Sequence, residues 1–216
     1  LGVDCITGGD QIYYKKDMVS SFPAFGHVLR PANLPHEAPG RGWRIFTAGG
    51  VKVAVLSLLG MNGFSRMHGA NPYVVLPDLV KRIQAETPNI ILDFHSVTTA
   101  EKVTMGMYAD GKLSAIFGTG LKTLTADGGI LPGGTAAISD TGRTGSLQSA
   151  GGFDPRLEID QFLTGIPGRS HESWEGLEIQ GALVELAENG RASYFETIRI
   201  PITEKPSDSN RDSDED

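Results

Sequence analysis

The sequence Ile90-Ile91-Leu92-Asp93-Phe94-His95 is a short apolar run that ends in an acid and a histidine. Such a run predicts a buried strand whose polar side chains lie at its carboxyl end, where open α/β sheets bind their ligands. A second stretch, Gly118-Thr119-Gly120-Leu121-Lys122, follows further along the chain. We expect it to be the loop that completes a site beside His95, although it contains neither an imidazole nor a carboxylate.

The rest of the chain alternates strand and helix patterns. A hairpin is expected around Ala48-Gly49-Gly50 and another at Asn189-Gly190, because such dipeptides favour tight turns. Helical spacing and capping patterns predict helices, among them one that begins with the capping box Thr98-Thr99-Ala100-Glu101. The expected strands are 4–7, 43–47, 51–58, 90–95, 113–117, 136–140, 177–186 and 192–200, and the expected helices are 77–86, 99–108 and 155–163. This order predicts an α/β layered domain.

Composition and charge limit the function classes. The chain has 216 residues, of which 39% are hydrophobic and 21% charged, enough for one large soluble domain. A net charge of -7 without a basic cluster argues against a nucleic-acid groove. No apolar run is long enough to span a membrane, and the single Cys5 fits a reducing, cytoplasmic compartment.

His95 is the strongest candidate for chemistry. A neutral imidazole at a strand end is a common metal ligand, and Asp93, two positions earlier, points to the same face. A hydrogen-bonded core histidine explains the pattern equally well, and one ligand does not make a metal site. Asp10 follows two glycines after the first expected strand, where it is either a metal ligand or general base, or the N-cap of the next segment.

Ser139-Asp140-Thr141-Gly142 offers a different chemistry. An apolar run followed by Asp-Thr-Gly is typical of aspartic peptidases, whose mechanism needs two such aspartates. The chain contains no second copy, so only a homodimer would supply the pair.

An ordered series of motifs resembles the YmdB-type metallophosphoesterases. The series covers roughly residues 1–200 and consists of Arg30-Pro31-Ala32-Asn33, Asp93-Phe94-His95 with Thr99-Ala100-Glu101-Lys102, Ala109-Asp110-Gly111-Lys112, Thr125-Ala126-Asp127, Gly134-Thr135-Ala136, Ser139-Asp140-Thr141-Gly142 and Phe162-Leu163-Thr164-Gly165-Ile166-Pro167. The resemblance implies a calcineurin-like fold, with a β-sandwich core flanked by helices. It also implies a centre of two divalent metals of the manganese or iron type that hydrolyses cyclic nucleotide phosphodiesters.

The same resemblance exposes departures at the expected metal site. The family's Gly-Asn-His-Thr loop stands here as Gly9-Asp10-Gln11-Ile12, so Gln11 occupies the position of the catalytic histidine. The family's Gly-Thr-His-Thr-His loop stands here as Gly118 to Lys122, without either imidazole. The family's first strand would precede Leu1, which predicts an N-terminally incomplete domain over 1–203 and an acidic, disordered tail over 204–216.

Three hypotheses follow from these departures. The first is a catalytically degenerate homologue without a bound metal, which has a structural, scaffolding or regulatory role. The second is an active metal-dependent phosphodiesterase with a rearranged site that uses Asp10, His95 and further carboxylates. The third is a pocket that retains Asp10 and His95 and binds a phosphate or nucleotide through Lys122 and Thr119 without cleaving it. We also expect a homo-oligomer or hetero-assembly that covers the incomplete sheet edge.

Overall fold

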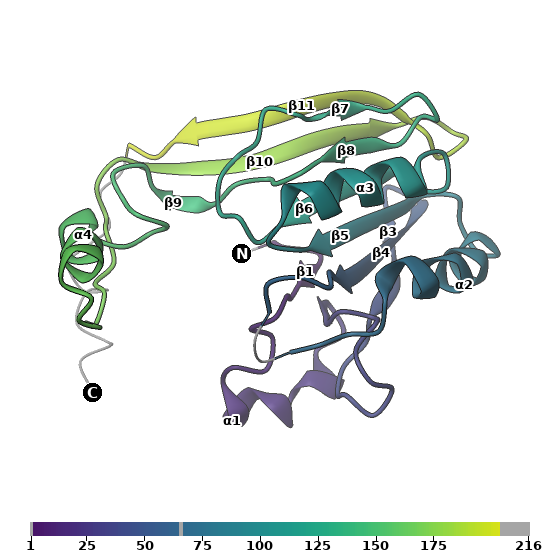
Figure 1. Cartoon of the computed structure of the whole chain (residues 1–216). Coiled ribbons are helices and arrows are strands. Elements are labelled where there is room, and N and C mark those ends of the chain that lie inside the picture. The colour runs from purple at the N-terminus through teal and green to yellow at the C-terminus, as the bar shows by residue number, and fades with distance from the viewer. Residues whose placement is uncertain (1, 65–66, 204–216) are drawn as a thin grey trace. The chain divides into compact units, whose positions relative to one another are not determined.

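The computed structural model describes residues 2–64 and 67–203 (Figure 1). The predicted acidic tail over 204–216 lies outside the described residues. The chain forms two compact units: residues up to Gly142 with Ala182–Thr197, and Arg143–Gly181 with residues from Ile198 onward. That the two act as the single domain expected over 1–203 stays a prediction.

A six-stranded mixed sheet is the main element of the first unit. Its strands run in the order β3-β4-β5-β6-β8-β7. Their bounds are β3 Trp43–Ala48, β4 Val51–Leu59, β5 Ile90–His95, β6 Ala115–Thr119, β7 Gly129–Ile130 and β8 Ala136–Ile138. The strands β4, β5, β6 and β8 are parallel, whereas β3 and β7 pair antiparallel with their neighbours. The α/β fold with mixed strands confirms the sequence prediction.

Two helices cover one face of this sheet. They are α2 (Pro72–Gln84) and α3 (Thr99–Ala109), which Figure 1 shows on the same side of the sheet. Alternate strand residues such as Leu56, Leu92 and Phe94 are fully buried against Ile83 of α2 and Met105 of α3. Because side chains alternate across a strand, their neighbours point to the opposite face. The helical face therefore forms the hydrophobic core that holds β5 in place.

Helix α2 begins earlier than the predicted start at residue 77. Asn71 caps it by accepting a hydrogen bond from the Tyr73 backbone N–H at 3.0 Å, and Pro72 occupies the first turn. Pro77 lies inside the helix, where its missing N–H leaves the Tyr73 carbonyl without a helical donor. The Tyr108 hydroxyl of α3 donates to this carbonyl at 3.0 Å. A tertiary contact thus compensates for a proline that the sequence pattern places at a helix start.

The predicted capping box of α3 does not form. The helix begins at Thr99 as expected, but the Thr98 side chain makes no capping hydrogen bond. The Glu101 carboxylate instead accepts from the Ser96 hydroxyl at 2.6 Å and from the Met61 backbone N–H at 2.7 Å. Glu101 therefore connects the loop after β4 to the loop after β5.

The N-terminal segment of the first unit contains only short elements. They are β1 (Ile6–Thr7), α1 (Lys16–Val19), a 3₁₀ turn (Phe22–Ala24) and β2 (Val28–Leu29), and β1 pairs with β2 in parallel. Residues 2–20 are exposed or at most half-buried. This segment nonetheless carries Asp10 to the carboxyl edge of the large sheet.

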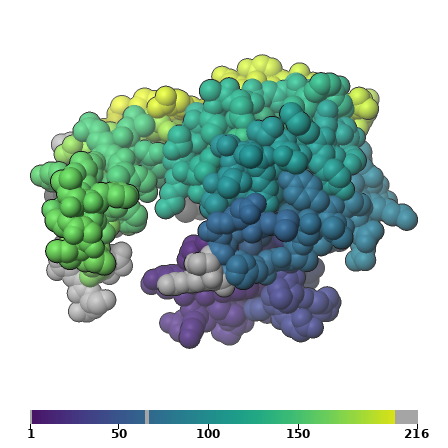
Figure 2. All heavy atoms as spheres, in the orientation of Figure 1, coloured from purple at the N-terminus to yellow at the C-terminus, as the bar shows by residue number. Residues whose placement is uncertain are grey.

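The second unit contains β9 (Thr144–Ser146), α4 (Pro155–Thr164), the first part of β10 (Leu177–Leu186) and the end of β11 (Ala192–Pro201). The Asp154 side chain caps α4, and Gly165 ends the helix in the left-handed region. No residue of α4 is buried, and Figure 2 shows this helix in green at the surface. No helix among the described residues is long and apolar enough to cross a membrane.

Candidate functional site

The candidate site lies where β5 and β6 end. His95 is the last residue of β5 and pairs in register with Thr119, the last residue of β6. Because the two strands are parallel, both side chains reach the same edge of the sheet. Asp10 arrives at this edge from the loop that follows β1. The structure therefore brings together His95, Asp10 and Thr119, three residues that the sequence analysis selected.

A continuous chain of hydrogen-bonding groups connects two carboxylates through the imidazole of His95. The Thr119 hydroxyl donates to Asp93 Oδ1 at 2.8 Å, and Thr119 Oγ1 lies 2.9 Å from His95 Nδ1. On the other side of the ring, His95 Nε2 lies 3.1 Å from Asp10 Oδ1. The ring is thus oriented by Thr119 and directs Nε2 toward Asp10.

The protonation states in this chain depend on one another. Burial raises the pKa of Asp93, against the lowering effect of hydrogen bonds from Thr119 and Thr7. When Asp93 is ionised and accepts the Thr119 proton, Thr119 must accept from His95 Nδ1–H. His95 Nε2 then faces the Asp10 carboxylate, so a proton or another cation must lie between these two atoms. When Asp93 is protonated, a neutral His95 with its proton on Nε2 satisfies every contact.

The ring of His95 is also packed tightly. Phe64 stacks on it with ring centroids 5.5 Å apart and an interplanar angle of 19°. On the Asp10 side, Gly9 approaches so closely that a Cβ there would lie 2.4 Å from Nε2. Glycine is therefore required at position 9 for the backbone to reach the imidazole. The two glycines are evident in the sequence, but no sequence pattern predicts this contact.

The positions where the resemblance implies imidazoles carry other contacts. The Gln11 amide Nε2 donates to Asp10 Oδ2 at 2.7 Å, so the Asp10 carboxylate has His95 on one oxygen and Gln11 on the other. Gly120 adopts φ 111° and Lys122 φ 60°, the latter being a left-handed conformation in a non-glycine residue. The side chain of Lys122 is exposed. Its role as an anion contact, together with Thr119, stays a prediction.

The described residues do not complete a metal centre by themselves. In the described part of the chain only His95 Nε2 and Asp10 Oδ1 converge, whereas metal sites in proteins use three or more protein ligands. Among residues 2–64 and 67–203, no group of three or more His, Cys, Asp and Glu side chains is placed to hold a metal ion. The donor set therefore does not fit the two-metal centre that the resemblance implies.

Asp140 lies in a buried ion pair rather than in an open cleft. Its Oδ2 is 2.9 Å from Lys102 Nζ, and the Asp140 side chain is 0% exposed. An aspartic-peptidase carboxylate must reach a substrate and a second aspartate, so this burial argues against that alternative. No sequence pattern predicts the pairing of Asp140 with Lys102.

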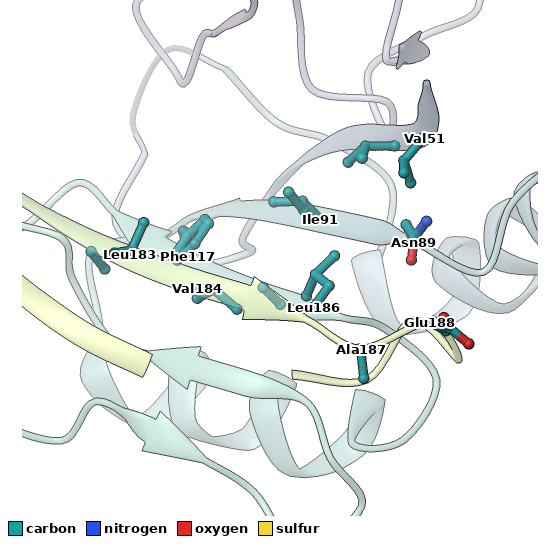
Figure 3. A pocket seen from close by; sticks show the side chains of 12 residues that line it. Val51, Asn89, Ile91, Phe117, Leu183, Val184, Leu186, Ala187 and Glu188 are labelled. Carbon is teal, nitrogen blue, oxygen red and sulfur yellow. The ribbon is translucent and has the colours of Figure 1, made fainter. Parts of the chain in front are cut away.

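An apolar cavity of about 720 Å³ lies on the sheet face opposite the two helices (Figure 3). It is lined by residues of β4, β5 and β6 and, from the same unit, of β10 and its turn, with Asn89 and Glu188 as its polar members. Within the described residues its lining includes neither His95 nor Thr119. The cavity is therefore separate from the candidate chemistry, and the predicted partner for an incomplete sheet stays a prediction.

Comparison with known proteins decides the family. Residues 1–198 match the model of the family described as YmdB-like protein. The chain belongs to the YmdB-like family. A relative named 2',3'-cyclic-nucleotide 2'-phosphodiesterase, from Bacillus subtilis (strain 168), is 34% identical over 185 residues, which cover 86% of this chain and 69% of the relative.

Solved structures support the same assignment. A crystal structure described as a novel phosphatase from Mycoplasma pneumoniae superposes with a TM-score of 0.85 at 30% identity, covering 93% of this chain and 73% of that chain. The NAD nucleotidase of Haemophilus influenzae superposes with a TM-score of 0.56 at 14% identity, covering 93% of this chain and 40% of that chain. At that identity the second match shows the fold alone. The YmdB-like fold is thus shared with phosphatase and nucleotidase structures.

Proposed function

We propose that this YmdB-like protein hydrolyses phosphodiesters of the cyclic-nucleotide class at the His95 site. The B. subtilis relative, with its 34% identity, carries a 2',3'-cyclic-nucleotide phosphodiesterase name. The structural observation that carries the proposal is the convergence of His95 Nε2 and Asp10 Oδ1, 3.1 Å apart, at the carboxyl edge of the parallel strands. This is the edge where an α/β sheet binds its ligand.

In the proposed site, the residues of this chain orient the imidazole of His95 and place its Nε2 beside a carboxylate oxygen of Asp10. Asp93 and Thr119 fix the ring of His95, so that Nε2 faces Asp10 Oδ1 at 3.1 Å. The described residues provide two donors, which is too few to hold a metal ion by themselves.

A second candidate function is non-catalytic and rests on a specific observation. The described residues offer no third ligand, and the Gln11 amide donates to the Asp10 oxygen that is not bound to His95. A degenerate site of this kind retains the fold for a structural or regulatory role, or binds a phosphate without cleaving it. Gly120 and Lys122, in place of the expected imidazoles, support this candidate.

One set of measurements separates the two candidates. The purified protein is assayed for bound metal and for hydrolysis of 2',3'-cyclic AMP and bis(4-nitrophenyl) phosphate with added Mn²⁺. The proposal expects turnover that His95→Ala reduces by about a hundredfold or more, while the exposed His36→Ala leaves it unchanged. Absence of metal and of turnover in the wild-type protein would refute hydrolysis and favour the second candidate.

A further inference from the structure

A fully buried ion pair lies next to the candidate site without contacting His95. Lys102 of α3 and Asp140, in the loop after β8, are 2.9 Å apart and have side-chain exposures of 2% and 0%. Transferring two charges from water into the interior is costly, and well-packed apolar residues often give equal or greater stability. A contribution to stability alone therefore does not explain why this pair is buried here.

The carboxylate of Asp140 is fixed by three donors from three segments of the chain. Its Oδ2 accepts from Lys102 Nζ at 2.9 Å and from the Leu121 backbone N–H at 2.8 Å. Its Oδ1 accepts from the Gly142 backbone N–H at 2.9 Å. Charge-assisted bonds of this kind are stronger than neutral ones. Asp140 consequently links α3 to the turns that follow β6 and β8.

The Leu121 amide belongs to the turn that contacts the imidazole. Thr119 Oγ1 lies 2.9 Å from His95 Nδ1, and a Cβ on Gly120 would lie 3.3 Å from His95 Cε1. The turn ends at Lys122 in the left-handed region, which a non-glycine residue adopts only when its surroundings hold it there. The bond from Leu121 to Asp140 supplies such a constraint directly after Gly120.

We propose that Lys102 and Asp140 are positioning residues of the His95 site. Asp140 holds the turn 119–122 through the Leu121 amide, and Lys102 neutralises the buried Asp140 carboxylate. The turn then fixes the ring of His95 through Thr119. This inference deepens the proposed function, and its relevance to turnover rests on that function. The placement of the turn, however, is measurable without any activity.

The decisive variant is Lys102→Met/Asp140→Leu, which replaces the pair with apolar side chains of similar size. Native-state hydrogen exchange is followed at the Leu121 and Gly142 amides, which we expect to exchange roughly tenfold faster or more, since each loses a charged acceptor. The Glu86 and Thr87 amides bond to the backbone carbonyl of Ile83 at the end of α2 and serve as internal controls whose exchange stays unchanged.

The ring of His95 supplies a readout that a purely structural role would not move. We expect its Nδ1 and Nε2 resonances to shift in the double variant, because a displaced Thr119 no longer orients the imidazole. Arg156→Met removes the exposed pair with Asp154 in the second unit and should leave these resonances unchanged. Should the double variant fail to fold, Lys102→Met/Asp140→Asn keeps the size of Asp140 while removing both charges, and the same readouts apply.

The outcomes distinguish this inference from the proposed function. Unchanged Leu121 exchange together with unchanged His95 resonances in a folded double variant would overturn it. If the wild-type protein hydrolyses a cyclic nucleotide, kcat in the double variant should fall about tenfold or more, in line with the cost of a misplaced catalytic group. If the wild-type protein shows no turnover, the proposed function fails, and the exchange and ring measurements alone decide the role of the pair.

Discussion

Replacing Gly9 with alanine tests the geometry of the site directly. A Cβ at this position would lie 2.4 Å from His95 Cδ2 and Nε2, well inside van der Waals contact. The ring has little room to withdraw, because Thr119 binds Nδ1, Asp10 faces Nε2 and Phe64 stacks on one side. The backbone at Gly9 is not in the left-handed region, so any effect comes from the added methyl group.

The expected magnitude follows from overpacking. Inserting a methyl group into a filled site costs about 1–3 kcal/mol. For a chain of this length each kcal/mol lowers the melting temperature by roughly 2–4 °C, so Gly9→Ala should melt roughly 2–12 °C below the wild type. The ring of His95 should also move away from Asp10, which changes its Nε2 resonance.

Thermal unfolding and histidine NMR are the assays, and Gly129→Ala is the matched control. Gly129 also lies outside the left-handed region, and no group among the described residues lies within 4 Å of its added Cβ. This control should stay within about 0.5 kcal/mol of the wild type. If Gly9→Ala behaves like Gly129→Ala in both assays, Gly9 does not pack against His95 and the site geometry is wrong.

Three further predictions concern charge, packing and acidity. Lys102→Met should lower the free energy of urea unfolding by about 3–5 kcal/mol, because it leaves Asp140 charged and buried. A loss below about 1 kcal/mol would contradict the presence of a buried Lys102–Asp140 ion pair. Phe94→Ala should cost about 3–5 kcal/mol in the same assay, whereas Phe162→Ala, at a residue that is 90% exposed, should cost less than about 0.5 kcal/mol. Burial, reinforced by the nearby Asp93, raises the pKa of Cys5 from 9.0 to about 11, so fewer thiolates form at pH 8. The rate of Cys5 alkylation by iodoacetamide, followed by intact mass, should be about a hundredfold lower in the native protein than in the protein unfolded in urea, and the native rate should rise up to about pH 11. Equal rates in the native and unfolded protein would contradict this burial.

Local patterns predicted the central elements of the fold well. The apolar run 90–95 is a strand with those bounds, and Asn189-Gly190 joins β10 to β11 as expected. Errors arose where a tertiary partner overrides a local signal. Pro77 reads as a helix start but lies inside α2, because Tyr108 binds the carbonyl that the proline leaves free. Glu101 reads as part of a capping box but bonds to Ser96 and Met61 instead.

The site was predictable only as far as strand ends identify it. His95 and Asp10 both follow apolar strand patterns, and the structure brings them within hydrogen-bonding distance. Lys102 and Asp140 are 38 residues apart and belong to no shared local pattern, so their pairing had no sequence signal. Thr119 was selected as an anion contact, yet its hydroxyl already bridges Asp93 and His95, which depends on the register of β5 and β6.

The shallow packing of the N-terminal segment has a consequence for the lifetime of the site. Asp10 reaches His95 across 85 residues of chain, yet residues 2–20 are at most half-buried. Segments with less buried surface open at a lower free energy than the core of a domain. We therefore expect the loop that carries Asp10 to open more readily than the large sheet, although β1 pairs with β2 and Ile12 and Tyr13 pack against buried side chains. The fraction of molecules with an assembled site is then set by this local equilibrium, and a ligand that bridges Asp10 and His95 would increase it.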